Sequence, residues 1–296
     1  MKEKKPIPFM KVTPLAIVLS LLIILAGVVV YVVNGGFEVG IDFKGGSRAE
    51  VALQQKVSVG EIRSLFKNVG IDANVTTVGL VEDNRFVITV PYEEGRDGIE
   101  LIKKTLYQAY GEDKVSLLGV TVVEAKVGKS FVYRALNLIW VVSLIILVYI
   151  VIRFDFSYGF GAVVALLHDL LIMLAFALFL RIPIDITIIA AILMILGYSI
   201  NDTIVVFDRI RERKALHKEE DFVLVIDRSV TEVLDRSIIT SLTTLFAAVA
   251  LYIWGGEVLR NFSVILIVGL ISGTYSSVMI ASPVTAGVRR LTNRAK

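Results

Sequence analysis

The sequence predicts a polytopic α-helical membrane protein with six transmembrane helices and one external α+β domain between the first two helices. Of its 296 residues, 55% are hydrophobic, which exceeds the roughly 45–50% typical of soluble proteins. The apolar residues fall into six long runs, each close to the length of about 20 residues that crosses a bilayer as a helix. Between the first two runs, at residues 34–130, charges recur every few residues, which indicates a water-facing domain.

The first apolar run follows a basic tail, residues 1–13, and extends from Pro14 to Val33 without a charge. A cleaved signal peptide has a shorter apolar region of about 7–15 residues, followed by a small-residue cleavage site. Here the run ends in Tyr31-Val-Val-Asn-Gly-Gly instead. We therefore interpret residues 14–33 as an uncleaved first transmembrane helix.

Residues 34–130 alternate between strand-like and helix-like patterns. The spacing predicts helices at Ser58–Asn68, opened by a Ser58-Val-Gly-Glu61 capping box, and at Asp97–Tyr110. The expected strands are Phe37–Phe43 and Ser47–Leu53 around a Gly45-Gly46 turn, Asn74–Gly79 and Arg85–Val90 around a Glu82-Asp83-Asn84 turn, and Lys114–Lys126. The order strand, helix, two strands, helix, strand predicts a ferredoxin-like α+β sandwich. Its sequence contains no metal cluster, no nucleophile with a histidine partner and no phosphate loop, so binding is favoured over catalysis.

Five further apolar runs follow the external domain. They are Phe131–Ile152, Ser157–Leu180, Ile184–Phe207, Ser237–Trp254 and Phe262–Val288. Helices two to four therefore occupy 131–207, and helices five and six occupy 237–288, before a tail at 289–296. The last run contains Gly269 and Gly273, a Gly-xxx-Gly pair of the kind that lets membrane helices pack closely. An even number of spans places both termini on the same side.

The distribution of Lys and Arg predicts that both termini are cytoplasmic. Basic residues gather in the two tails and in the segment 208–236, whereas the opposite short loops carry few charges. By the positive-inside rule these basic segments face the cytoplasm, and 34–130 lies outside. Within 208–236, apolar residues recur at helical spacing beside acidic ones, which predicts an amphipathic helix that lies at the inner membrane surface and runs into the fifth span. A plain connector packed under the bundle is the alternative.

Asp202 stands out because it lies in the apolar part of the fourth span, with Asn201 beside it. A carboxylate in lipid costs roughly 2.5–3.5 kcal/mol on insertion scales, so such residues face other helices or water and commonly serve as proton or ion sites. The alternative is a structural contact, or an acid wetted from the membrane surface, since Asp208 and Arg209 follow about 9 Å further along the helix.

His168 and Asp169 lie near the middle of the third span. Histidine titrates near neutral pH, so the pair is a candidate proton relay. The competing interpretation is a hydrogen-bonded pair that fixes helix packing. Nothing in the sequence places the pair beside Asp202.

Arg236 begins the fifth span near the same membrane surface as Asp202. An ion pair between them would favour the ionised carboxylate and its loss would favour protonation, which gives a two-state element for proton coupling. The alternative is an arginine that snorkels at a helix end. Asn201 beside Asp202, Tyr198 one turn before it, and Thr240 one turn after Arg236 are candidates for the same site or for interhelical hydrogen bonds.

Composition excludes several other functions. The formal net charge of +3 is small and gives no basis for a nucleic-acid partner. The chain has no cysteine and two histidines, so we expect no disulfide, no thiol chemistry, no metal site and no cofactor. An intramembrane hydrolase that uses Asp169 and Asp202 is disfavoured because the two carboxylates lie at different depths, roughly 5–10 Å apart. We therefore expect no enzymatic activity.

Two motifs carry a wider resemblance: GIDFKGG at residues 40–46 and GYSINDTIVVFDRIRE at residues 197–212. With His168-Asp169 and the Arg236-Ser-Ile-Ile-Thr-Ser segment, they resemble the SecF protein-export membrane proteins of the SecD/SecF family, in the resistance-nodulation-division superfamily. The resemblance covers the whole chain, and the external region is as short as in SecF. The positions that match the first family motif are Gly40, Asp42, Gly45 and Gly46.

The resemblance implies a complex with SecD that assists the SecYEG translocon and uses the proton-motive force to move unfolded preproteins across the bacterial plasma membrane. YajC and YidC are further candidate partners. The resemblance also implies that Asp202 and Arg236 take part in proton coupling. The alternative function is a half-transporter of the resistance-nodulation-division type that exports small solutes or lipids by proton antiport, which a solute-flux assay in liposomes would distinguish.

Overall fold

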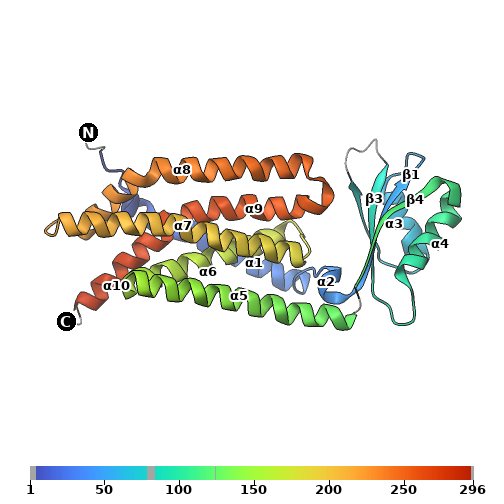
Figure 1. Ribbon diagram of the computed structural model, residues 1–296, viewed down its shortest axis with the longest axis horizontal. Coiled ribbons are helices and arrows are strands. Elements are labelled where there is room, and N and C mark those ends of the chain that lie inside the picture. Colours follow the sequence, from blue (N-terminus) through green and yellow to red (C-terminus); the bar gives the residue numbers. More distant parts are fainter. Residues whose placement is uncertain (1–4, 79–83, 124, 295–296) are drawn as a thin grey trace.

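The computed structural model describes residues 5–78, 84–123 and 125–294. Within these residues, six helical segments are long and apolar enough to cross a membrane. They run side by side as a bundle, and an α+β domain stands beyond one end of it (Figure 1). The first helix begins and the last one ends at the opposite end of the bundle. The predicted fold class is therefore confirmed.

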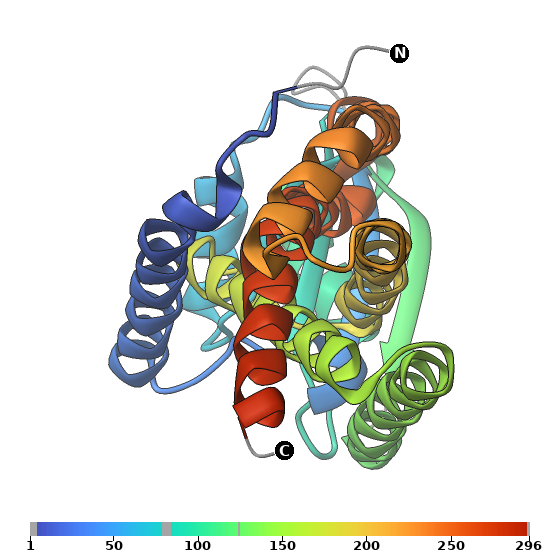
Figure 2. The ribbon, with the colours of Figure 1, turned by 90° about the vertical axis from the view of Figure 1, so that its left-hand side faces the viewer.

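The bundle is built from long helices that the sequence pattern located closely. Their bounds are α1 Phe9–Asn34, α5 Ala125–Arg153, α6 Phe156–Phe179, α7 Ile186–Leu216, α8 Phe222–Trp254 and α9 Gly256–Ser276. The last span continues through a π-helical turn, η3 (Ser277–Ala281), into α10 (Ser282–Arg294). Seen from the end away from the sheet, α1 and α5 lie at the periphery (Figure 2). The spans of α6, α7 and α9 are 50–56% buried, against 6–17% for α1, α5 and α8, so the first three form the interior where polar groups are shielded from lipid.

The external domain has the predicted order of elements. It contains β1 Gly46–Leu53, α3 Val59–Asn68, β2 Asn74–Val78, β3 Arg85–Pro91, α4 Gly98–Tyr110, the short η2 Glu112–Lys114 and β4 Val115–Val123. The sheet has the order β2-β3-β1-β4, and every neighbouring pair is antiparallel. This arrangement is that of a ferredoxin-like sandwich, so the prediction from periodicity is confirmed.

One face of the sheet forms the core of this domain. Alternate residues of β1, among them Ala49 and Val51, are fully buried against Phe66 of α3 and Leu106 of α4. Burial of each large apolar side chain stabilises the domain by about 1.5–3 kcal/mol. The capping box also forms as predicted, because the Ser58 hydroxyl accepts a hydrogen bond from the Glu61 backbone N–H at 3.2 Å.

The expected strand at Phe37–Phe43 is wrong. Residues Ile41–Lys44 form a single helical turn, α2, and only Val39 pairs, in a parallel bridge with Ile184 before α7. Tertiary contact therefore overrides the alternating apolar pattern of this segment. The expected strand Lys114–Lys126 also ends early, because β4 stops at Val123 and α5 begins at Ala125. The predicted turn falls partly on residues 79–83, outside the described residues.

Close packing of α7 against α9 is the main contact of the interior. A Cβ added at Gly269 would lie 2.6 Å from Ile195, and one added at Gly273 would lie 2.9 Å from the Ser199 Cβ. The Gly-xxx-Gly pair therefore faces two positions of α7 that are one turn apart, as the sequence motif predicts.

The helix expected within 208–236 is continuous with the fifth span. Helix α7 continues to Leu216, and the expected helix is the first part of α8. Its apolar residues Val225, Ile226 and Val230 are buried in a cluster that includes Phe207 of α7. The expected helix therefore runs into the fifth span without a break and packs against α7, while its place at the inner membrane surface stays a prediction.

Candidate functional site

Asp202 lies inside the bundle, on α7, with 3% of its surface exposed. The Ser241 hydroxyl of α8 donates a hydrogen bond to Asp202 Oδ2 at 3.4 Å, and Ser241 also shares a hydrogen bond of 2.6 Å with Thr274 of α9. The acid therefore sits where α7, α8 and α9 meet. This is the shielded position that an intramembrane carboxylate requires.

Arg236 lies on α8, about one turn before Ser241, and its side chain is exposed. Within the part of the chain that the structure describes, no ion pair joins Arg236 to Asp202. A direct ion pair between the two side chains therefore requires a movement of α8 or of the arginine side chain.

Asp169 is the most completely buried acid, with 0% of its surface exposed. Its Oδ1 accepts a hydrogen bond from Ser272 at 2.6 Å, and its Oδ2 accepts hydrogen bonds from Ser199 at 2.6 Å and Ser276 at 2.8 Å. These hydroxyls belong to α7 and α9, whereas Asp169 belongs to α6. The carboxylate therefore joins three helices at the centre of the bundle.

His168 extends this cluster to α1. Its Nδ1 lies 3.1 Å from Asp169 Oδ1, and its Nε2 lies 2.9 Å from the Ser20 hydroxyl. Ser20 in turn lies 3.0 Å from the Tyr275 hydroxyl, which donates a hydrogen bond of 2.5 Å to the Ala16 carbonyl. We call His168, Asp169 and these hydroxyl partners the His168–Asp169 cluster. Both uses expected from the sequence, helix packing and proton relay, are compatible with it.

The two buried acids occupy neighbouring positions on the same pair of helices. Ser199, which binds Asp169, precedes Asp202 by one turn of α7. Thr274, which contacts Ser241, lies on α9 between Ser272 and Ser276. No hydrogen bond between the described residues joins the two carboxylates directly. A change of packing between α7 and α9 therefore affects both.

Sequence reasoning missed most of the hydroxyl partners. They are Ser20, Ser199, Ser272, Thr274, Tyr275 and Ser276. One available signal was the spacing of Ser272 and Ser276, which places two hydroxyls on one face of an apolar helix. That signal is weak because serine in a helix often bonds the carbonyl of the preceding turn instead.

In the part of the chain that the structure describes, three expected site residues contact neither Asp202 nor the His168–Asp169 cluster through a hydrogen bond. Asn201 is exposed, and the buried Tyr198 hydroxyl has no hydrogen-bond partner among the described residues. Thr240 donates its hydroxyl to the Arg236 carbonyl at 3.0 Å, within its own helix. The contacts of Asp202 therefore come from Ser241 rather than from these three residues.

The family-motif residues connect the external domain to the N-terminal end of α7. The Gly40 N–H donates to the Ile184 carbonyl at 2.8 Å, and Asp42 Oδ2 accepts a hydrogen bond of 3.1 Å from the N–H of Ile186. Gly45 and Gly46 have φ values of 82° and 157°, and a Cβ at Gly46 would lie 2.6 Å from the Val90 carbonyl. Glycine is required at the second position because both the conformation and the space exclude a side chain.

Burial raises the pKa of Asp185, which precedes the first residue of α7, and the nearby Asp42 carboxylate raises it further. Asp185 also caps α7, since its Oδ1 accepts a hydrogen bond of 2.9 Å from the Ile188 N–H. Two carboxylates from different parts of the chain thus bind backbone N–H groups of the same helix start. The favourable charge at a helix N-terminus explains this placement.

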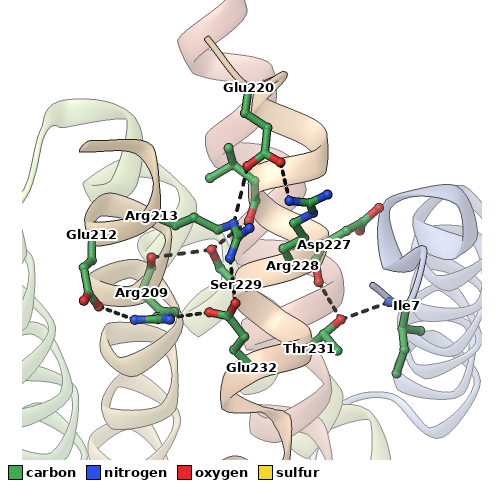
Figure 3. A network of polar contacts seen from close by, with 11 residues as sticks. Ile7, Arg209, Glu212, Arg213, Glu220, Asp227, Arg228, Ser229, Thr231 and Glu232 are labelled. Carbon is green, nitrogen blue, oxygen red and sulfur yellow. Dashed lines mark hydrogen bonds and ion pairs between the residues drawn. The ribbon is translucent and has the colours of Figure 1, made fainter. Parts of the chain in front are cut away.

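A network of ion pairs fixes the opposite end of α7 (Figure 3). Glu232 of α8 pairs with Arg209 at 2.5 Å and with Arg213 at 2.6 Å, and Glu220 pairs with Arg228 at 2.8 Å and with Arg213 at 3.4 Å. Arg213 is only 5% exposed. The turn between α7 and α8 is therefore held by shared, partly buried charges.

The same part of α8 holds the start of α1 (Figure 3). Asp227 Oδ1 accepts a hydrogen bond of 2.9 Å from the N–H of Met10, and the Thr231 hydroxyl accepts one of 3.0 Å from the N–H of Ile7. The N-cap residue of α1, Pro8, provides no side-chain cap. Asp227 therefore supplies a cap from a different helix, which couples α1 to α8.

Fold and site together define a multi-pass membrane protein with two ionisable clusters shielded between its helices. Comparison with known proteins identifies the group to which it belongs. The family model described as "Protein export membrane protein SecD/SecF, C-terminal" matches residues 102–290. The chain belongs to the SecD/SecF family of protein-export membrane proteins.

Individual relatives match over nearly their whole length. Protein translocase subunit SecF of Alicyclobacillus acidocaldarius is 40% identical over 90% of this chain and 87% of its own length. The protein of the same name from Rhodothermus marinus is 40% identical over 97% of this chain and 94% of its own. These matches extend the similarity to the external domain, which the family model covers only in part.

Two solved structures share the fold. The crystal structure of SecDF from Thermus thermophilus has a TM-score of 0.85 at 30% identity and covers 98% of this chain. A second structure, SecDF in a super-membrane-facing form, has a TM-score of 0.67 at 30% identity and covers 99% of this chain. This chain spans 40% of the length of each of those chains. Since identity is equal and the TM-scores differ, the two structures differ in the arrangement of the matched part.

Proposed function

We propose that this chain acts as the SecF half of a SecD–SecF assembly, which uses the proton-motive force to promote preprotein export across the bacterial plasma membrane. The observation that carries this proposal is the burial of Asp202 at the junction of α7, α8 and α9. A carboxylate in that position changes the charge of the bundle interior when it gains or loses a proton.

The comparisons support SecD as a partner. The chain spans 40% of the solved SecDF chain, and the remainder of such a chain would be supplied here by a separate SecD subunit. The SecYEG translocon is the next partner of the assembly, with YajC and YidC as further candidates. Clusters of Lys and Arg in the tails and in 208–236 support an orientation with both termini in the cytoplasm and the external domain outside.

The proposed mechanism begins with protonation of Asp202, which removes its charge and weakens the attraction of Arg236. Helices α7 and α8 then repack, and the outer end of α7 carries the movement to the external domain through Asp42 and Gly40. Each elementary charge that crosses 100 mV supplies about 2.3 kcal/mol. A few protons per cycle are therefore sufficient to shift a domain whose two positions differ by several kcal/mol.

The test is export of a preprotein into vesicles that contain the translocon, SecD and this chain, with and without a proton gradient. In Asp202→Asn the shape of the side chain is kept and the titratable proton is lost. We expect this variant to lose the stimulation by the gradient while its gradient-independent export is unchanged. Stimulation equal to wild type, at equal expression and equal binding to SecD, would refute the proposal.

A matched control is Asp208→Asn, which makes the same change on the same helix. Asp208 is partly exposed and pairs with Arg153 at 3.1 Å, away from the bundle interior. An exposed ion pair of this kind contributes about 0–1 kcal/mol. The control should keep the response to the gradient, so that a loss in Asp202→Asn reports the buried site alone.

A further inference from the structure

The His168–Asp169 cluster contains a linear series of hydrogen bonds whose directions are fixed from one end. The series runs from His168 Nε2 to the Ser20 hydroxyl, then to the Tyr275 hydroxyl and finally to the carbonyl of Ala16. A carbonyl only accepts, so Tyr275 donates its single proton to Ala16. The series therefore ends in α1, on the turn that precedes Ser20.

The remaining directions follow in turn. Because the Tyr275 proton is already used, the 3.0 Å contact between Tyr275 and Ser20 requires that Ser20 donate. Because the Ser20 proton is then used, the 2.9 Å contact with His168 requires a proton on Nε2. Nε2 of His168 therefore donates to Ser20. The hydrogen-bond network thus determines that this nitrogen carries a proton.

The other side of the ring then fixes the proton count. Nδ1 lies 3.1 Å from Asp169 Oδ1, and this contact also requires a proton. The proton resides on Nδ1, as a histidinium beside a carboxylate, or on Asp169, as a carboxylic acid that donates to a neutral ring. Both arrangements contain one proton more than a neutral histidine beside an ionised aspartate.

We propose that His168 and Asp169 form a proton-binding site of their own, distinct from Asp202, and that the structure shows this site in its proton-loaded state. The site is built from α6, α7 and α9, and its loaded state ties α1 to them through Ser20 and Tyr275. It stands whether or not Asp202 couples proton movement to export.

The surroundings of the site contain few competing charges. The groups that bind the pair from α1, α7 and α9 are serine hydroxyls, and Tyr275 of α9 is the other titratable side chain in the series. Among the described residues, including those of α5 and α10, no lysine or arginine forms a hydrogen bond or an ion pair with His168 or Asp169. Asp202 of α7 is one turn from Ser199 but is bound to Ser241. The serine hydroxyls stabilise a negative charge on Asp169, but they do not supply the proton that the contact between Asp169 and Nδ1 requires.

Loss of the extra proton has a mechanical consequence. With one proton fewer, Ser20 must turn its hydroxyl toward Nε2, and the contact between Ser20 and Tyr275 loses its proton. Tyr275 has one proton for its two contacts with α1, so only one of the contacts to Ser20 and Ala16 stays hydrogen-bonded, and the attachment of α1 to α9 weakens. A cavity of about 320 Å³, lined by Ser20, His168 and Tyr275 among others, adjoins this contact and leaves room for the movement. Since α1 leads to the Gly40 segment, a movement of α1 caused by release of this proton is transmitted to the external domain.

The direct test counts the protons on the pair. The chain has two histidines, and His217→Gln removes the exposed one, so that full-length protein in lipid nanodiscs gives a single histidine signal. Nitrogen-15 NMR at pH 7 reports both ring nitrogens, and the infrared carboxyl band assigned with Asp169→Asn reports the acid. We expect two ring protons with an ionised Asp169, or Nε2–H with a protonated Asp169. One ring proton beside an ionised Asp169 would overturn the assignment.

A variant tests the relay from Tyr275. In Tyr275→Phe, Ser20 is free to donate to Nε2, so the form with one proton fewer becomes fully bonded. We expect its proton affinity, measured by the same signals, to fall about three- to tenfold, the effect of one net hydrogen bond. Tyr149→Phe, on the exposed face of α5, is the matched control and should titrate like wild type. A Tyr275→Phe titration equal to that of the control would contradict the relay.

Discussion

Asp42 of the external segment accepts a hydrogen bond of 3.1 Å from the backbone N–H of Ile186, the first residue of α7. The same α7 carries Asp202 in its interior. A residue outside the bundle thus caps the helix that holds the buried acid. The external domain and the proposed proton site are therefore connected through α7.

Replacement of Asp42 by alanine tests that connection. Loss of a capping side chain costs about 0.5–2 kcal/mol, so we expect faster amide exchange at residues 186–189 and weaker gradient-stimulated export. Asp97→Ala is the control, because Asp97 caps α4 inside the external domain with a bond of 2.9 Å to Ile99. Equal exchange at the start of α7 in both variants would show that Asp42 does not hold the helix.

Gly273→Ala tests the packing that brings both acids to one helix pair. Its Cβ would lie 2.9 Å from the Ser199 Cβ, so α7 and α9 must move apart, at a cost of about 1–3 kcal/mol. We expect a lower melting temperature in detergent and a loss of the Ser199–Asp169 bond. Gly197→Ala, on α7, meets nothing within 4 Å. If the two alanine variants had the same melting temperature, the close approach of α7 and α9 would not limit stability.

Glu232→Ala tests the ion-pair network at the α7–α8 turn. The change removes a carboxylate that binds Arg209 and the nearly buried Arg213. Hydrogen bonds to charged groups are worth about 1.5–3 kcal/mol, so we expect lower stability and faster amide exchange at residues 217–221. Glu212→Ala removes an exposed partner of Arg209 and should change stability by less than about 1 kcal/mol. Equal losses in the two variants would contradict the role of Glu232 as the shared centre.

Tyr110 of the external domain provides a prediction about pH. Burial, and then the charge and hydrogen bond of Glu61, raise the pKa of Tyr110 from 10.0 to about 12. The folded domain therefore keeps this proton between pH 10 and 12 while the unfolded chain releases it, so stability falls as pH rises through that range. Tyr110→Phe should lose stability less steeply there, and the tyrosinate absorbance difference between the two proteins should appear near pH 12. A midpoint near pH 10 would contradict the buried contact with Glu61.

Much of the fold could be predicted from the sequence because hydrophobic periodicity reports burial directly. The apolar runs gave the six spans, and the alternation in β1 and β3 gave the sheet. The segment Phe37–Phe43 alternates like a strand, but it was misassigned because its Val39 pairs only with Ile184, which is far away in the chain. No local rule contains that contact.

The candidate site was predictable in part for a different reason. Asp169 and Asp202 stood out since a charge in an apolar run is rare. Their serine partners did not, because a serine of an apolar helix can bond a carbonyl of its own helix, as Ser263 does, or a side chain of another helix, as Ser272 does with Asp169. The choice between these two uses depends on which helix lies opposite, which only the three-dimensional structure provides.

The central claim is that the protonation state of Asp202 is transmitted to the external domain. The chain has no cysteine, so Lys67→Cys on α3 and Leu216→Cys at the end of α7 can carry two spin labels without further changes. The decisive measurement is the distance distribution between these labels in acid and in alkali, for wild type, Asp202→Asn and Asp208→Asn. The account predicts that wild type and Asp208→Asn change with pH, whereas Asp202→Asn keeps the acid distribution throughout. A pH response in Asp202→Asn equal to that of wild type would contradict it.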